Sequence, residues 1–135
     1  NTLSKDIQLD IWRKFLFITM VSGIGAITRV TYKYLQQSDK IKEIIWKTGE
    51  EVVSVANAKG IPLKKQDIEF SMQAFINSVP NTTASMQRDM MEGKPSELEN
   101  FNGYIVDQGK QLGIETPTNA FIYHCLLPQE MKARS

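Results

Sequence analysis

Apolar residues recur every three to four positions along almost the whole chain. Such spacing gathers them on one face of an α-helix, whereas a half-buried strand alternates with period two. No stretch alternates in that way over more than a few residues. The pattern therefore predicts an all-α fold of about six to seven helices. We expect a single helical domain that spans residues 1–135.

The first predicted helix begins after Ser4 or Asp6 and is apolar on every side beyond Ile11. A helix without a polar face belongs in the middle of a core. Gly23 and Gly25 lower helix propensity, so we expect either a kink or a close backbone contact there. The helical pattern resumes beyond the glycines, and a bend is expected near them.

Further helices are predicted, each bounded by residues that begin or end helices. They run from about Ser38 to Gly60, from near Ile68 to before Pro80, from Thr82 or Thr83 to Gly93, from Ser96 to Gly113, and from Thr116 onward. Glycine after a helix suits a left-handed residue, and Pro117 suits a first helical turn. Ser96 and Glu99 have the spacing of a capping box.

Composition is that of a folded domain with no strong preference for charged partners. Hydrophobic residues make up 41% and charged ones 23%, close to the average of globular proteins. The net charge of +1 creates no field that would attract nucleic acid or an acidic membrane. The longest uncharged run, from Phe15 to Thr28, is too short for a bilayer. We expect neither nucleic acid nor a membrane as partner.

The chain has one cysteine, Cys125, and one histidine, His124. A single cysteine excludes an intrachain disulfide and a Cys-rich zinc site, and a single histidine argues against a His-based metal cluster. We expect no bound metal, and Cys125 as a core residue. Because no secretory leader is visible, a cytoplasmic, reducing location is expected.

Lys14 is the most informative position for chemistry. At about 100° per residue it lies on the same stripe as Ile7, Ile11 and Ile18, so the helix directs an ammonium group along an apolar face. The side chain either extends to an edge, the usual outcome for lysine, or lines a cleft. In a cleft it suits proton donation to a carbonyl oxygen.

Three other polar residues are candidates with plain structural alternatives. Glu97, near the start of the fifth helix, could simply offset the helix dipole. Ser85 and Asp89 lie one turn apart on the fourth helix and could point at one pocket, or at solvent.

Several short segments keep a spacing that is specific in combination. They are Ile11-Trp12-Arg13-Lys14, Ser85-Met86 with Asp89, Ser96-Glu97, Asn102-Gly103-Tyr104 and Gly113-Ile114-Glu115-Thr116-Pro117. Together they resemble the C-terminal domain of ketopantoate reductase (2-dehydropantoate 2-reductase), over essentially the whole chain. This domain is all-helical, like the C-terminal domains of 6-phosphogluconate-dehydrogenase-type reductases.

The resemblance implies an oxidoreductase that uses NADPH to reduce 2-dehydropantoate to pantoate, on the route to pantothenate and coenzyme A. By position, Lys14 resembles the catalytic general acid, and Glu97 the acidic residue that orients substrate and lysine. Ser85 is similar to the serine at the substrate's carboxylate side. Asp89 and Thr82 fall on supporting or substrate-binding positions.

The family's cofactor is held by an N-terminal Rossmann domain, and these 135 residues contain no strand, glycine loop and helix that could cradle its phosphates. The chain alone is therefore expected to be inactive. Relatives with this domain are frequently dimers, so a homodimer is expected.

Two positions depart from the family. Ile18 and Thr82 stand where asparagines are usual, and loss of an amide from a polar pocket changes discrimination between substrates. The alternatives are a reductase of another 2-oxo acid and a non-catalytic helical dimerisation module.

Overall fold

The computed structural model describes the backbone of residues 2–135 and the side chains from Asp6 on. Over these residues it contains helices and no strand, which confirms the all-α prediction. The elements are α1 (Thr2–Thr28), α2 (Tyr32–Gln36), α3 (Asp39–Ala58), α4 (Lys65–Ile76), α5 (Ser85–Met91), the 3₁₀ helix η1 (Leu98–Asn100), α6 (Asn102–Leu112) and α7 (Pro117–Arg134).

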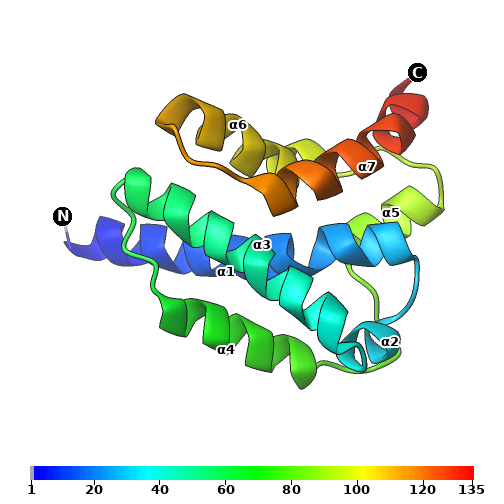
Figure 1. Ribbon diagram of the computed structural model, residues 1–135, viewed down its shortest axis with the longest axis horizontal. Coiled ribbons are helices and arrows are strands. Elements are labelled where there is room, and N and C mark those ends of the chain that lie inside the picture. The colour runs from blue at the N-terminus through cyan, green and yellow to red at the C-terminus, as the bar shows by residue number, and fades with distance from the viewer. Residues whose placement is uncertain (1) are drawn as a thin grey trace.

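Helix α1 runs through the middle of the molecule (Figure 1). Helices α3, α4, α5 and α7 all pack against it, with α4 on one side and α6 and α7 on the other. Every residue of α1 from 19 to 26 is buried. The prediction that this helix lies inside the core is confirmed, although it begins at Thr2, slightly earlier than expected.

The two glycines of α1 allow close contacts with neighbouring helices. A Cβ atom at Gly23 would clash with the side chains of Ile122 and Asn102, and one at Gly25 would lie 2.6 Å from the amide oxygen of Gln87. Of the two expectations for this segment, close contact is the one observed, and α1 continues through both glycines. The helix ends beyond them, where Arg29 adopts φ 60°.

The first helix and α2 are separate elements, whereas the apolar pattern suggested one continuing helix. Arg29 is the one non-glycine residue with positive φ in the described part of the chain. A left-handed residue interrupts helical hydrogen bonding, so the chain turns and α2 starts at Tyr32. This turn brings Tyr32 to the 79–84 segment, where its backbone N–H donates to the carbonyl of Thr82 at 3.0 Å.

Local signals correctly predicted several helix ends. The Ser38 hydroxyl accepts from the backbone N–H of Ile41 at 3.2 Å and caps α3. Gly60 and Gly113 have φ of 85° and 72° and follow α3 and α6 as left-handed residues. Pro117 is the first residue of α7.

The predicted capping box at Ser96 and Glu99 is wrong. Residues 98–100 form a 3₁₀ turn, and α6 begins only at Asn102. The Glu99 carboxylate accepts from the hydroxyl of Tyr123 at 2.6 Å, and the Ser96 hydroxyl donates to Glu130 at 2.8 Å. Both side chains are thus hydrogen-bonded to residues of α7 that are distant in sequence. For this reason they do not form the predicted cap with each other.

The expectation that Cys125 is a core residue is also wrong, since its side chain is exposed. Ile122 and Leu126 are the apolar residues that α7 buries against α1 and α5, whereas Phe121 is 67% exposed. The first turn of α7 is fixed by Glu51 of α3, whose carboxylate accepts from the backbone N–H groups of Thr118 and Asn119 at 2.9 Å each.

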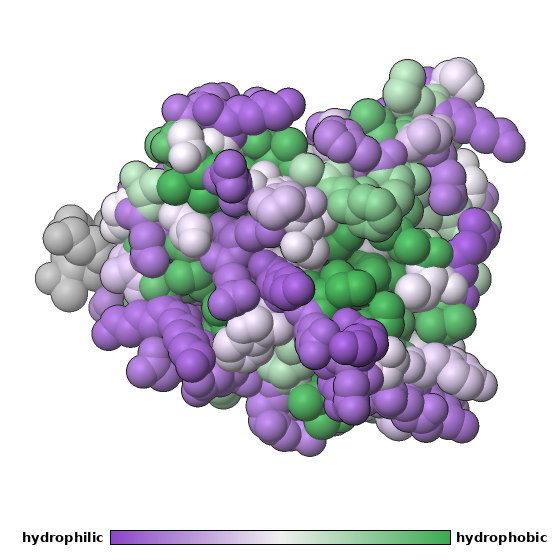
Figure 2. Space-filling model, viewed as in Figure 1, coloured by the Kyte–Doolittle hydropathy of each residue, from purple (hydrophilic) through white to green (hydrophobic). Residues whose placement is uncertain are grey.

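By length and composition alone, α1 from Asp6 to Thr28 could cross a membrane. Half of that segment is buried inside the fold, as in the core helix of a globular domain. On the face shown in Figure 2, hydrophobic residues gather near the middle and right and hydrophilic ones surround them.

The contacts of Gly23 lead to a stability prediction. Gly23→Ala should lower the free energy of unfolding by about 1–2 kcal/mol, because overpacking a fixed core outweighs the gain in helix propensity. Ile122 and Asn102 are 1% and 0% exposed and have little room to move. Urea unfolding followed by circular dichroism measures the change.

Ser54→Ala, on the exposed face of α3, is the control and should leave stability nearly unchanged. A Gly23→Ala protein as stable as this control would contradict the close packing of α1.

Candidate functional site

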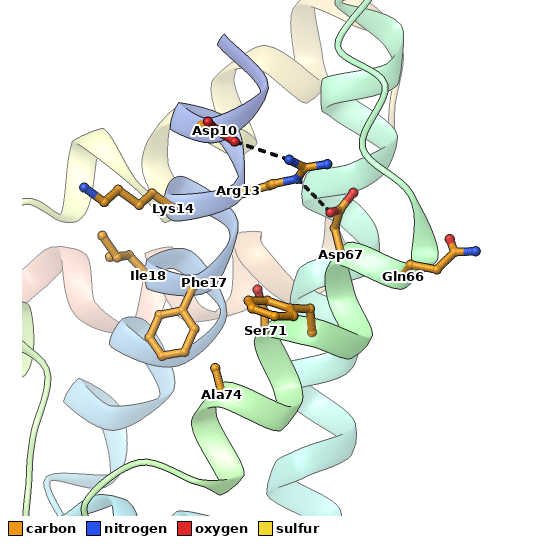
Figure 3. Close-up of a pocket in the computed structure, with 10 residues that line it drawn as sticks. Asp10, Arg13, Lys14, Phe17, Ile18, Gln66, Asp67, Ser71 and Ala74 are labelled. Carbon is orange, nitrogen blue, oxygen red and sulfur yellow. Dashed lines mark hydrogen bonds and ion pairs between the residues drawn. The ribbon is translucent and has the colours of Figure 1, made fainter. Parts of the chain in front are cut away.

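A cavity of about 720 Å³ lies between α1 and α4. Polar side chains line the end of the cavity that lies nearest the N-terminal ends of α1 and α4, and the rest of the cavity wall is largely apolar (Figure 3). The residues of α1 that line it are Asp10, Arg13, Lys14, Phe17 and Ile18, and those of α4 are Gln66, Asp67, Phe70, Ser71 and Ala74.

One ion pair joins the two helices across this cavity. The Nε atom of Arg13 donates to Asp67 at 3.0 Å, and its Nη1 atom donates to Asp10 at 3.2 Å. The hydrogen bond to Asp67, which contributes most, raises the pKa of Arg13. Asp67 also accepts from the backbone N–H of Lys64 at 2.8 Å, so one carboxylate caps α4 and ties it to α1.

A second cavity, of about 320 Å³, lies on another side of α1. Its wall combines apolar side chains with four that carry hydroxyl or carboxyl groups. The apolar ones are Phe17, Ile18, Val21, Ala84, Met86 and Phe101, and the polar ones are Ser22, Tyr32, Ser85 and Glu97.

The two cavities adjoin at Phe17 and Ile18, which line both. Lys14 and Ile18 lie one turn apart on the same side of α1, and both side chains point away from α4 (Figure 3). The ammonium group of Lys14 is therefore directed to the side on which Ile18 borders the smaller cavity. Lys14 lines the larger cavity, whereas Ser85 and Glu97 line the smaller one, so the three candidates are divided between two cavities that share Phe17 and Ile18.

Thr82 and Asp89 line neither of these cavities. The carbonyl of Thr82 accepts from the N–H of Tyr32 at 3.0 Å, and the carbonyl of Asp89 accepts from the N–H of Lys94 at 2.8 Å. Ser85 lines the smaller cavity, whereas Asp89, one turn away on α5, does not.

A profile of the family described as "Ketopantoate reductase PanE/ApbA C terminal" matches residues 6–130. The chain belongs to this family.

Relatives of known sequence agree with that assignment. The chain is 28% identical over 131 residues to the 2-dehydropantoate 2-reductase of Aquifex aeolicus, covering 94% of this chain and 42% of the relative. It is 27% identical over 122 residues to that of Vibrio cholerae, covering 90% and 41%. The chain thus spans about two-fifths of the length of these relatives.

Solved structures show the same helical architecture. The dimeric ketopantoate reductase of Staphylococcus aureus has a TM-score of 0.89 and 24% identity, covering 94% of this chain and 44% of that one. A ketopantoate reductase from Ralstonia eutropha has a TM-score of 0.82 and 27% identity, covering 92% and 41%. D-mandelate dehydrogenase with NADH and anilino(oxo)acetate has a TM-score of 0.86 and 22% identity, covering 96% and 42%.

The smaller cavity of this ketopantoate reductase domain includes residues that sequence reasoning missed. Tyr32 is 6% exposed, and burial, opposed in part by the charge of Arg88, raises the pKa of its hydroxyl. Ser22 is buried beside Gly23 on α1. Neither stands in a recognisable motif, and the turn at Arg29 that carries Tyr32 to the cavity has no clear sequence signal.

The described residues offer little for a metal ion or for phosphates. They contain no group of three or more His, Cys, Asp or Glu side chains placed to hold a metal. Arg13 and Lys14 are the only cations that line the two cavities, and Arg13 is already paired with two aspartates. These residues do not fit the phosphates of a dinucleotide.

The loop that carries Glu97 is tied to α7. Glu97 accepts from the side-chain amide of Asn100, and Glu99 accepts from Tyr123 at 2.6 Å. The hydrogen bond to Glu99, with a smaller effect of burial, raises the pKa of Tyr123 to about 12. The neutral tyrosine therefore anchors this loop to α7 throughout the physiological pH range.

This contact predicts a pH dependence. The folded pKa of Tyr123 exceeds the ordinary 10.0, so its contribution to stability is complete below pH 10 and is lost from there to about pH 12. Glu99→Gln should lower the pKa of Tyr123 toward the ordinary value. Ultraviolet titration of tyrosinate, with the Tyr123→Phe protein subtracted, measures it.

Gln73→Glu, on the exposed face of α4, provides a control for a change of one charge. An unchanged Tyr123 titration in the Glu99→Gln protein would contradict the contact.

Proposed function

We propose that this chain is the C-terminal, substrate-side domain of an NADPH-dependent 2-dehydropantoate 2-reductase. The family match and the relatives support this reading. The observation that supports it most is that Lys14 lines one cavity and Ser85 and Glu97 line a second cavity, and that the two share Phe17 and Ile18.

Lys14 is the general acid of the proposal. Reduction of a 2-oxo acid places negative charge on the former carbonyl oxygen, which then takes up a proton. An ammonium group supplies both a positive charge and that proton. NADPH, when bound, supplies the hydride.

Ser85 and Glu97 bind and orient the 2-oxo acid from the smaller cavity. The hydroxyl of Ser85 can donate to the substrate's carboxylate, while Glu97 can accept from Lys14 or from a substrate hydroxyl. Thr82 and Asp89 act as supporting residues. Thr82 does so through its carbonyl, which holds Tyr32 at the cavity.

The remaining parts of the proposal concern the whole protein. An N-terminal Rossmann domain, preceding residue 1, would hold the NADPH phosphates that the two cavities do not fit. This chain by itself is then inactive. The proposed assembly is a homodimer, which the dimeric relative supports, and the proposed location is the cytoplasm. Light scattering of the purified full-length protein tests the assembly.

A second candidate is reduction of a 2-oxo acid with an apolar side chain. Ile18 places a branched hydrocarbon at the junction of the two cavities, and most of the smaller cavity is apolar. The related fold of D-mandelate dehydrogenase, solved with anilino(oxo)acetate, supports such a substrate class. A protein inactive toward both classes would instead favour a non-catalytic dimerisation module.

The role of Lys14 can be tested in the full-length protein. Lys14→Ala should lower kcat by at least about 100-fold, the lower end of what loss of acid catalysis costs. NADPH oxidation with 2-dehydropantoate measures turnover. Lys40→Ala, on the exposed start of α3 and with a side chain 88% exposed, is the matched control and should retain activity.

Turnover that is the same in the Lys14→Ala and control proteins would refute the assignment of Lys14 as the acid. Absence of any activity in the wild-type full-length protein would refute the reductase function itself.

The position of Ile18 predicts a change in substrate preference. Ile18→Asn should raise kcat/KM for 2-dehydropantoate relative to 4-methyl-2-oxopentanoate by about tenfold, because the amide can bond the side-chain hydroxyl that only the first substrate has. Competition between the two substrates measures the ratio.

Ile7→Asn is the control, since Ile7 lies on the same helix but is 51% exposed and lines neither cavity. An equal ratio in the Ile18 and Ile7 variants would show that Ile18 does not contact the substrate's side chain.

A further inference from the structure

Ser96, the residue before Glu97, is held by the last turns of α7 through all its polar groups. Its backbone N–H donates to the two carboxylate oxygens of Glu130 at 2.9 and 3.1 Å, and its hydroxyl donates to Glu130 at 2.8 Å. Its carbonyl accepts from Arg134 at 3.1 Å. The Ser96 hydroxyl also accepts from the backbone N–H of Leu98 at 3.2 Å.

Glu130 is a buried carboxylate, 2% exposed, and its hydrogen bonds account for its position. Besides Ser96, its partner is Arg134, whose Nε atom donates at 2.8 Å. A buried carboxylate is costly unless such donors surround it, and an apolar residue would pack α7 at lower cost. In this domain the donors that surround the Glu130 carboxylate come from Ser96 and from Arg134, one turn away on α7.

The arrangement determines where Glu97 stands. Ser96 and Leu98 are 6% and 0% exposed, whereas Glu97 between them is exposed and lines the smaller cavity. With both neighbours fixed, the backbone of Glu97 has little freedom. Its side chain is further held by Asn100.

We propose that Glu130 and Arg134 are positioning residues for the reaction, which hold the Glu97 carboxylate at the substrate cavity by clamping Ser96. This inference rests on the proposed function, since it acts through Glu97. Neither residue lines the cavity, so neither touches the substrate. We call these hydrogen bonds from Glu130 and Arg134 to Ser96 the clamp. Through the clamp, the C-terminal end of α7 controls the position of Glu97.

The core of α7 is secured independently of the clamp. Ile122 and Leu126 are each 1% exposed and pack with Ala26, Met86 and Leu98. Glu130 lies one helical turn beyond Leu126, and Arg134 lies two turns beyond it, toward the C-terminus. Its loss should therefore loosen the loop while leaving the helix docked.

The test is a double-mutant cycle in the full-length protein. Glu130→Gln removes the charge and one acceptor, and kcat/KM with 2-dehydropantoate should fall about tenfold, as for a group displaced by a fraction of an ångström. In a Glu97→Ala background the same change should alter kcat/KM by less than about twofold, because the residue it positions is gone.

The unfolding temperature separates this role from a merely structural one. Glu130→Gln should shift it equally in both backgrounds, whereas the kinetic effect should appear only when Glu97 is present. Glu92→Gln is the matched control, since Glu92 is an exposed carboxylate that pairs with Lys94 and lines neither cavity. This control should keep wild-type kinetics.

Ser96→Ala provides a second route if Glu130→Gln does not fold, because it removes only the hydroxyl from the clamp. It should also lower kcat/KM, and only with Glu97 present. If Glu130→Gln or Ser96→Ala lowers kcat/KM by the same factor with and without Glu97, the inference is overturned while the reductase function stands. A wild-type protein without 2-oxo acid reduction would overturn both.

Discussion

The whole domain depends on neighbouring helices reaching the backbone of α1, and two glycines allow this. At Gly23 the space that a Cβ would fill is taken by Ile122 and Asn102, from α7 and α6. At Gly25 it is taken by Gln87 of α5. Interiors are packed to crystal-like density, so these contacts fix the separation of four helices at once. The amide of Gln87 also donates to the carbonyl of Val30 at 2.7 Å, which links α5 to the turn that follows α1.

The candidate site benefits from that central position. Lys14 and Ile18 stand one turn apart on α1, directly before its fully buried segment, so the frame that carries them is held from several sides. Catalytic groups need placement within a fraction of an ångström, which rigid elements provide better than loops. The Arg13–Asp67 ion pair is half-exposed on the arginine side and contributes little stability. It instead fixes α4 relative to the α1 face that lines the larger cavity.

Local features predicted the helices well, because caps and left-handed glycines depend on near neighbours. Ser38 and Gly60 illustrate this. The same reasoning failed at Ser96 and Glu99, where Glu130 and Tyr123 offered hydrogen bonds that no local rule anticipates. Residue spacing and the family resemblance singled out Lys14, Ser85 and Glu97. Their distribution over two cavities that share Phe17 and Ile18 follows from the packing of α1, α5 and the loop before α6, which sequence periodicity does not contain.

The three candidate residues are held by different forces, and the difference follows from their elements. Lys14 is itself exposed and is placed by the buried part of α1 that follows it, and Ser85 is placed by the docking of Met86 and Met90, which are 3% and 4% exposed. Glu97 stands in a segment whose only regular structure is a three-residue 3₁₀ turn, so hydrophobic burial alone cannot fix its backbone. Hydrogen bonds hold the backbone of this segment instead, since they specify orientation as well as position. The buried carboxylate of Glu130 therefore lies beside the least regular segment of the chain, where hydrogen bonds rather than helix packing hold the backbone next to Glu97.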